Sequence, residues 1–284
     1  MKFMEEKQQT VAGDIEFSGV GIHSGQVTRL VVRPAEAGTG LKFCRTDLPG
    51  RPEIPVCAES GQESARATTL AKGKAMVFTV EHFLSALHAL KVDNALIEMD
   101  GPEPPILDGS SLPVVRALRE TGLVRQAARR RYATVSEPVV VYGDKDHEQM
   151  VIALPSDDFR VSFTSINPHP LVGIQFRDVT VEEQAYEQQV APARTIAYEK
   201  EVEALHAAGL GLGGSLENTI VYSDEKWLTP LRFPDELVRH KILDLIGDLR
   251  VLGLVKGHFI AVKSSHALNG RLTKKIAALM KEKG

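Results

Sequence analysis

The sequence predicts an α+β fold made of two domains of related architecture. Each half of the chain contains a few short strands followed by two helices, an order that places strands under a layer of helices. The length of 284 residues suits one large or two medium domains. A basic run, Arg125–Arg131, separates the halves, so we expect domains over 1–124 and 132–284 with a linker over 125–131. No residue-level repeat is clear, and the relationship rests on the order of elements alone.

Composition excludes several classes of protein. The formal net charge is -3 and the isoelectric point is near 6.3, so bulk electrostatics do not favour nucleic-acid binding. Residues 1–9 are too polar for a signal peptide, and no stretch approaches the roughly 18 apolar residues that span a bilayer. Cys44 and Cys57 are expected to be reduced thiols. We therefore expect a cytoplasmic monomer without stable membrane insertion.

In the first half, strands are predicted at 26–33, 41–45 and 94–99, after a glycine-rich turn at Ser18–Gly25. A helix is predicted over Val80–Leu90, with Thr79 as its N-cap. A turn-rich loop, Gly101–Gly109, leads to a second helix over Ser111–Glu120, whose first turn tolerates a proline.

In the second half, predicted strands are 132–142, 149–154, 159–166, 218–222 and 258–262. Predicted helices are Thr195–Ala208, Pro234 to about Leu252, and a C-terminal helix from about Gly270. The loop Gly209–Ser215 fits neither a Walker pattern nor a dinucleotide fingerprint, and we expect a helix end and tight turn beside a ligand channel. The run Arg125–Arg131 is interpreted as a solvated connector, with a phosphate-binding patch as the alternative.

The segment Leu237–Leu249 carries the strongest chemical signal. It is apolar almost all round, which is typical of a buried helix, yet it places His240, Asp244 and Asp248 four residues apart on one stripe. A buried carboxylate needs a partner. The stripe therefore predicts either a metal site or a plain His–Asp hydrogen bond inside a core, and both remain open at this point.

A catalytic metal commonly has three protein ligands and one open position. Among the nine histidines, His82 is a candidate third ligand because Glu81 precedes it on a predicted helix. Adjacent helical side chains point about 100° apart, so one can bind a metal while the other takes a proton from nearby water. The alternative is that this Glu-His pair lies on the surface or at a helix cap.

Taken together, these segments resemble the UDP-3-O-acyl-N-acetylglucosamine deacetylase family (LpxC), which acts in lipid A biosynthesis. The matching blocks occur in family order between residues 19 and 272: Gly19–Gly25, Val80–Leu90, Asp93–Asn94, Pro105–Ser110, Ala193–Thr195, Leu212–Ser215, Leu237–Leu249 and His266–Asn269. The resemblance implies two similar two-layer α/β sandwich domains with the active site between them. It implies hydrolysis of the N-acetyl group of UDP-3-O-[(R)-3-hydroxyacyl]-N-acetylglucosamine to a free 2-amine and acetate, the committed step of that pathway.

The resemblance also implies roles for individual residues. A catalytic zinc, or ferrous iron in the cell, would be held by three ligands: His82, His240 and Asp244. The expected catalytic groups are a general base, an oxyanion-stabilising cation, the carboxylate that orients that cation, and a hydroxyl that polarises the amide carbonyl: Glu81, His266, Asp248 and Thr195. We expect His266 in a loop after a strand. Substrate contacts would come from two lysines near the diphosphate, Lys241 and Lys263, and from Tyr198 near the sugar.

The acyl chain requires an apolar channel, which the family forms with an insert that matches about 196–220 here. Candidate lining residues are Ile22, Val202, Leu205 and Leu212, each of which could instead be ordinary helix core. Two positions depart from the family pattern: Ile196 replaces a usual Phe, and Ser265 replaces a usual Gly. Two alternatives remain, a non-catalytic UDP-sugar or lipid-binding relative and a zinc amidase acting on another N-acetyl sugar.

Overall fold

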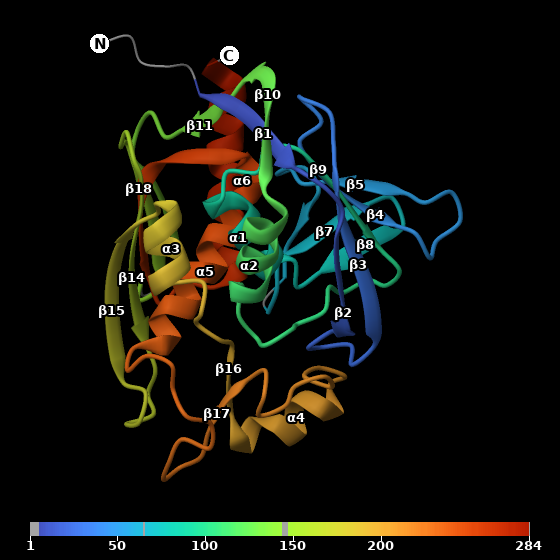
Figure 1. Ribbon diagram of the computed structural model, residues 1–284. Helices are drawn as coiled ribbons and strands as arrows, with labels where there is room; N and C mark the ends of the chain where they lie inside the picture. The colour runs from blue at the N-terminus through green and yellow to red at the C-terminus, as the bar shows by residue number, and fades with distance from the viewer. Residues whose placement is uncertain (1–5, 65, 144–146, 284) are drawn as a thin grey trace.

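The computed structural model describes residues 6–64, 66–143 and 147–283, so most of the polar N-terminal segment lies outside the described residues. It shows a mixed α+β arrangement in which the main helices lie between two larger sheets (Figure 1). Within the described ranges, no helix is both long and apolar enough to cross a membrane.

The first large sheet comes from residues before 100. Its five strands lie in the order β2 (Ile15–Val20), β3 (Val27–Pro34), β9 (Ala95–Met99), β4 (Leu41–Arg45) and β5 (Glu53–Pro55). A small sheet of β6 (Gly61–Gln62), β7 (Thr69–Lys72) and β8 (Ala75–Phe78) adjoins it through β5 and β7. The predicted strands at 26–33, 41–45 and 94–99 are confirmed.

The second large sheet comes from residues after 131. Its central path is β12 (Val139–Tyr142), β13 (Met150–Leu154), β18 (Leu254–Val262), β14 (Phe159–Ile166) and β15 (Ile174–Thr180), and β11 (Tyr132–Thr134) pairs with β18. The strands predicted at 149–154 and 159–166 are confirmed. The single strand predicted over 132–142 is wrong, because the chain leaves the sheet between β11 and β12, where Pro138 has no N–H to donate.

The main helices fill the space between these sheets, whereas α4 (Val202–Ala207) lies at the bottom of Figure 1 beside β16 (Ile196–Tyr198) and β17 (Ile220–Tyr222). The other helices are α1 (Glu81–Ala89), α2 (Leu112–Thr121), α3 (Glu183–Gln189), α5 (Glu236–Leu249) and α6 (His266–Lys283), with 3-10 turns at Glu199–Glu201 and Arg250–Leu252. Helix α5 packs on β14 and β15, α6 on β12 and β13, and α2 on β2. Helix α1 crosses α5, and the ring of its Phe83 packs edge-on against Phe17 of β2. One hydrophobic cluster therefore runs through both halves of the chain.

Most of the basic run predicted as a linker belongs to a strand. Residues Leu123–Arg129 form β10, which pairs antiparallel with β1 (Lys7–Val11). The burial of Arg130 explains part of this order, because its guanidinium donates to Asp93 at 2.8 Å and to Glu6 at 3.1 Å. The basic segment is thus anchored by its one buried arginine, while Arg129 and Arg131 are exposed.

The helix predicted over Thr195–Ala208 is wrong in its first half. Residues Ile196–Tyr198 form β16, which pairs in parallel with β17 (Ile220–Tyr222), and the α-helix starts only at Val202. This pairing joins segments more than 20 residues apart, and local periodicity does not report it.

Two helix starts also differ from expectation. Thr79 is not the N-cap of α1; it has φ 57° and its hydroxyl donates to Glu103 Oε1 at 2.8 Å. Helix α6 begins at His266, so this residue lies in the first turn of a helix and not in a loop. Its side chain is therefore anchored on a regular element.

We predict that Gly247→Ala destabilises the protein, because a Cβ at Gly247 of α5 would lie 2.3 Å from the backbone oxygen of Glu81 in α1. Overpacking of this kind costs roughly 1–3 kcal/mol. The measurement is the free energy of unfolding in urea. The matched control is Gly270→Ala in α6, where a Cβ would meet nothing within 4 Å. Equal effects of the two substitutions would contradict the close helix crossing.

Candidate active site

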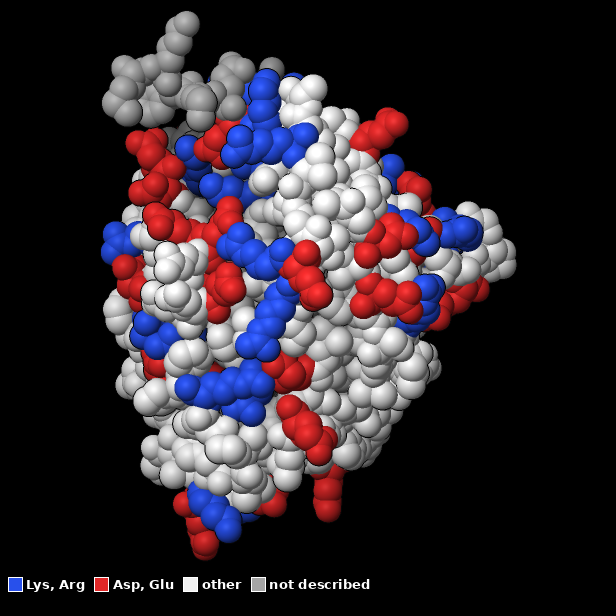
Figure 2. All heavy atoms as spheres, viewed as in Figure 1, with Lys and Arg blue, Asp and Glu red and all other residues white. Residues whose placement is uncertain are grey.

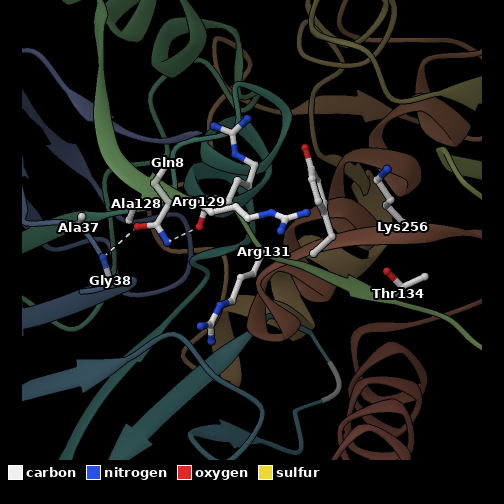
Figure 3. Close-up of a pocket in the computed structure, with 10 residues that line it drawn as sticks. Gln8, Ala37, Gly38, Ala128, Arg129, Arg131, Thr134 and Lys256 are labelled. Carbon is white, nitrogen blue, oxygen red and sulfur yellow. Dashed lines mark hydrogen bonds between the residues drawn. The ribbon is translucent and has the colours of Figure 1, made fainter. Parts of the chain in front are cut away.

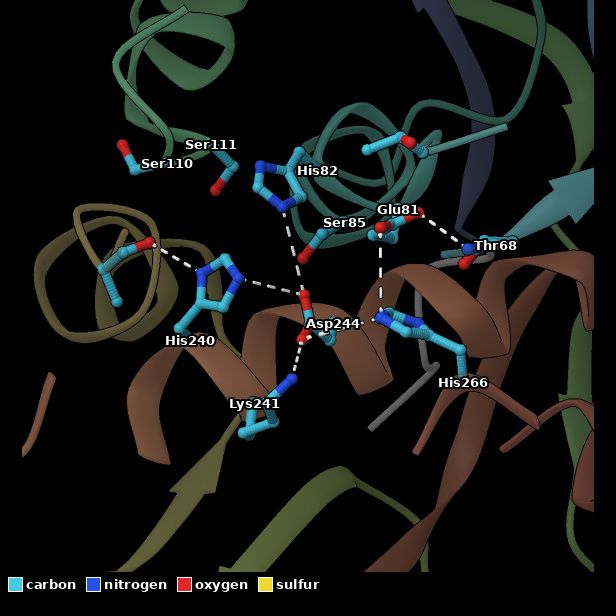
Figure 4. A network of polar contacts seen from close by, with 12 residues as sticks. Thr68, Glu81, His82, Ser85, Ser110, Ser111, His240, Lys241, Asp244 and His266 are labelled. Atoms are coloured by element: carbon cyan, nitrogen blue, oxygen red, sulfur yellow. Dashed lines mark hydrogen bonds and ion pairs between the residues drawn. The ribbon is translucent and has the colours of Figure 1, made fainter. Parts of the chain in front are cut away.

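The crossing of α1 and α5 brings three potential metal ligands together (Figure 4). Asp244 Oδ1 lies 3.3 Å from His240 Nε2 and 4.0 Å from His82 Nε2. The three potential ligand atoms all lie within 4.8 Å of one another, and all three residues are buried. The stripe predicted on one helix face thus meets the histidine predicted from the other helix.

The protonation of this cluster suits a metal ion. His240 Nδ1 lies 3.1 Å from the backbone oxygen of Ala193, which can only accept, so Nδ1 carries the proton and Nε2 presents a lone pair. Burial lowers the pKa of His240 and lowers that of His82 to about 3, which keeps both imidazoles neutral. Burial alone would raise the pKa of Asp244, but neighbouring His240 and Lys241 hold it below its usual range. Two neutral imidazoles and one carboxylate are a donor set that zinc and ferrous iron both accept.

Glu81 stands beside this cluster, one residue before His82. Burial raises its pKa to about 7, while the nearby charge of His266 acts in the opposite direction. The backbone N–H of Thr68 donates to Glu81 Oε2 at 2.9 Å. A fixed carboxylate with a pKa near neutrality can accept a proton and release it again.

His266 lies on the other side of Glu81. Its Nδ1 is 3.0 Å from both carboxylate oxygens of Asp248, and its Nε2 is 4.0 Å from Glu81 Oε1. Burial alone would lower the pKa of His266, but the carboxylates of Asp248 and Glu81 raise it to about 10. Asp248 is held in turn by Asn269 Nδ2 at 2.7 Å and by the Thr68 hydroxyl. The arrangement provides an imidazolium whose Nε2–H faces the cluster.

Lys241 and Lys263 occupy different environments. Lys241 Nζ donates to Asp244 Oδ2 at 2.8 Å. Burial alone would lower the Lys241 pKa, but the Asp244 carboxylate raises it. Lys263 Nζ lies 3.2 Å from Glu148, and Lys263 is not among the residues that line the cavity described next.

A cavity of about 640 Å³ opens onto these groups. Part of its polar lining comes from α1, α5, the start of α6 and the loop before β16: Glu81, His82, Thr195, His240, Lys241, Asp244 and His266. Its apolar lining comes mainly from the segment around α4, β16 and β17: Ile22, Ile106, Ile196, Ala197, Val202, Leu205, Leu216, Val221 and Leu228. A ligand with a polar head and an apolar chain would match this lining.

Like Lys263, two more of the predicted substrate-contact residues lie outside the cavity lining. Leu212 is half exposed and is not part of the cavity lining. Tyr198 is also outside the lining; its ring stacks on Tyr222 with centroids 5.0 Å apart, and its hydroxyl donates to Asp224. The predicted residues Ile22, Val202 and Leu205 do line the cavity.

Sequence reasoning missed Thr68, which contacts both Glu81 and Asp248. No local pattern marks it, because the β7–β8 hairpin folds it back onto α1. The missed Asn269 carried a weak signal, since it follows His266 by three residues and so lies near it on α6.

Comparison with known proteins gives one consistent result. The family model "UDP-3-O-acyl N-acetylglycosamine deacetylase" (LpxC) matches residues 8–278. Proteins named UDP-3-O-acyl-N-acetylglucosamine deacetylase are similar to the chain. One from Anaeromyxobacter sp. (strain Fw109-5) is 44% identical over 95% of this chain and 88% of its own length. Those from Thermosynechococcus vestitus and Bdellovibrio bacteriovorus are 43% and 42% identical over 95% of this chain, and the matches cover 94% and 89% of their own lengths.

We predict that the protein binds one divalent metal ion per chain and that His240→Ala weakens this binding by more than about 100-fold, because loss of a ligand exceeds the 10- to 100-fold typical of losing a ligand's hydrogen-bond partner. The measurement is metal content and affinity by mass spectrometry and chelator competition. His147→Ala, at an exposed histidine of the β12–β13 connection, is the control. Unchanged affinity in the His240 variant would contradict the site.

Proposed function

Because the chain belongs to the LpxC family of UDP-3-O-acyl-N-acetylglucosamine deacetylases, we propose that the α1–α5 cavity hydrolyses the N-acetyl group of UDP-3-O-[(R)-3-hydroxyacyl]-N-acetylglucosamine. The products are the free 2-amine and acetate, in lipid A biosynthesis. The observation that carries this proposal is the placement of a buried His-His-Asp cluster, Glu81 and His266 on one cavity that also has an apolar lining.

We propose His82, His240 and Asp244 as the ligands of a catalytic Zn²⁺, with Fe²⁺ accepted by the same donors. A divalent ion bound there supplies Lewis-acid chemistry, polarising the acetamide carbonyl and making nearby water more acidic. Asp244 is held by Lys241 from its other oxygen, which keeps the carboxylate oriented toward the two histidines.

Glu81 is the proposed general base. It takes a proton from the water that attacks the acetamide carbonyl carbon, and its pKa of about 7, raised by burial, suits this transfer near neutral pH. The Thr68 N–H fixes one carboxylate oxygen and leaves Oε1 on the side of His266.

His266 is the proposed cation. Asp248 accepts from Nδ1, so the Nε2–H is the proton available to the substrate. That proton stabilises negative charge on the carbonyl oxygen as water adds, and then moves to the departing amine nitrogen. The proposed role of Thr195 is a hydrogen bond to the carbonyl oxygen; its backbone is held by Gly109 at 3.0 Å and Ile220 at 2.8 Å.

For substrate binding, we propose that Lys241 reaches the diphosphate and that the apolar lining holds the acyl chain. The channel residues are Ile22, Val202 and Leu205, joined by the other apolar residues of the lining. Lys263 would support the diphosphate only after leaving its ion pair with Glu148. Leu212 and Tyr198 lie outside the lining and would meet substrate only where it leaves the cavity.

We also propose that the chain divides into two similar two-layer sandwich domains, 1–124 and 132–284, joined by 125–131 and with an insert at about 196–220. Each large sheet draws its strands from one half of the chain, which supports this division. The β1–β10 ladder and the α1–α5 contact would then hold the domains together around the active site.

The proposal is tested by incubating the purified protein with UDP-3-O-acyl-N-acetylglucosamine, with and without a chelator, and with zinc added back. Deacetylation that is lost to the chelator and restored by zinc supports both the reaction and the metal. No deacetylation by protein that holds one metal ion per chain would overturn the proposed substrate, and would point to a different N-acetyl sugar or to a binding role.

We predict that Glu81→Ala retains the metal but lowers kcat by about 10²- to 10⁴-fold, the range typical of general acid–base catalysis. Steady-state kinetics and metal analysis of the same preparation check this. The control is Glu63→Ala, which removes an exposed carboxylate in the connection between β6 and β7. Near-wild-type turnover in Glu81→Ala would show that another group is the base.

We predict that Thr68→Val lowers kcat with little change in KM, because it removes the hydroxyl donor to Asp248 while the Thr68 N–H to Glu81 remains. Thr68→Ser, which restores the hydroxyl, should recover most of the rate. The kinetics of both variants are measured together with their thermal stability. A loss of kcat without a loss of stability shows that the Thr68 hydroxyl positions Asp248, and not that the fold is destabilised. An equal loss of kcat in Thr68→Val and Thr68→Ser would argue against a positioning role for the hydroxyl.

A further inference from the structure

An ion pair in the interior of the protein joins Arg194, in the loop before β16, to Glu236, the first residue of α5. Many other charged side chains lie on the surface, and Figure 2 shows acidic and basic residues interspersed over the face in view. The Arg194 and Glu236 side chains are only 7% and 0% exposed, and Arg194 Nε donates to Glu236 Oε1 at 2.9 Å. Because burying two charges costs about as much as their attraction returns, stability alone does not account for this pair.

The Glu236 carboxylate holds main chain as well as a side chain. Its Oε1 accepts from the backbone N–H of Arg194 at 3.1 Å, and its Oε2 accepts from the backbone N–H of Arg232 at 2.6 Å. Arg194 Nη2 donates to the backbone oxygen of Pro230 at 2.7 Å, and Arg232 Nη1 donates to that of Pro192 at 2.8 Å. These bonds fasten the segments 193–195 and 230–232 to the start of α5.

The segment 193–195 carries groups of the candidate active site on both sides of Arg194. The backbone oxygen of Ala193 accepts from His240 Nδ1 at 3.1 Å, on the opposite side of the ring from Asp244 (Figure 4). Thr195 lines the cavity. Since Glu236 precedes His240 by four residues, it lies one turn earlier on the same face of α5. The face that carries the metal-ligand candidates therefore also carries the group that holds their backbone partner.

We propose that Glu236 is a positioning residue for the metal site and for Thr195. By fastening the backbone at Arg194, it fixes the Ala193 carbonyl that sets the tautomer and the ring plane of His240. Glu236 is not part of the cavity lining, so it acts through its neighbours and not by contact with substrate. This inference rests on the proposed metal ligands and on the proposed role of Thr195.

The test compares variants of the full-length protein by zinc affinity, measured by chelator competition without substrate. Glu236→Gln keeps the size of the side chain but replaces one acceptor oxygen with an NH2 group, which would face N–H donors of Arg194 or Arg232. Zinc affinity should fall by about 10- to 100-fold, the range for loss of a ligand's supporting hydrogen bond. At saturating zinc, kcat should also fall with little change in KM, because the proposed Thr195 contact forms in the transition state.

The matched control is Asp93→Asn, which breaks a second buried ion pair. The side chains of Arg130 and Asp93 are 5% and 10% exposed, and Asp93 likewise accepts a backbone N–H, from Gln9 at 2.8 Å. Arg130 lines the hollow drawn in Figure 3, where Gln8 accepts from Gly38, and this hollow shares no lining residue with the active-site cavity. Asp93→Asn should lower the free energy of unfolding, as Glu236→Gln does, but leave zinc affinity unchanged.

Equal zinc affinity in Glu236→Gln and the wild type, or equal losses in Glu236→Gln and Asp93→Asn, would overturn the proposal. If Glu236→Gln does not fold, Arg194→Gln is compared with Arg194→Lys, which keeps a cation beside the carboxylate. Zinc affinity should then fall further in Arg194→Gln, and equal affinities would overturn the proposal. A wild type that binds zinc but does not deacetylate would overturn the proposed substrate alone, because the zinc measurements use none.

Discussion

The close crossing of α1 and α5 is the constraint on which the site depends. Gly247 allows the backbone of α5 to approach the carbonyl of Glu81, where any Cβ would lie 2.3 Å away. The helical period of α5 then turns His240, Asp244 and Asp248 toward the first turn of α1. Because a shift of one helix along the other would separate these groups, the proposed metal ligands and the proposed acid–base pair share one geometric requirement.

Three buried carboxylates lie close together, and the number of donors around each distinguishes their roles. Asp248 accepts from His266, Asn269 and Thr68, so it is well stabilised as an anion. Asp244 faces Lys241 and two imidazoles. Glu81 accepts only the Thr68 N–H among the hydrogen bonds described, and burial raises its pKa to about 7. Glu81, the carboxylate with the fewest donors around it, is therefore the one suited to exchange a proton.

Much of the site was predictable, because several of its residues are spaced regularly within one short segment. The stripe on Leu237–Leu249 follows from the 3.6-residue period, and burial of its carboxylates implied a cation or metal partner. The Glu81–His82 pair marked His82 as one candidate among nine histidines, and the family resemblance was needed to choose it. Thr68 was missed because it reaches Asp248, 180 residues away, through a hairpin. The β16 strand was mistaken for helix because its order comes from a parallel partner beyond α4.

The position of Thr195 shows how both halves of the chain converge on the candidate active site. Its N–H donates to Gly109 of the first half, and its carbonyl accepts from Ile220 in β17. Gly109 has φ 83°, and a Cβ there would lie 1.7 Å from the oxygen of Asn218, so only glycine allows this approach. The turn-rich loop before α2 thus anchors the segment that lines the apolar cavity.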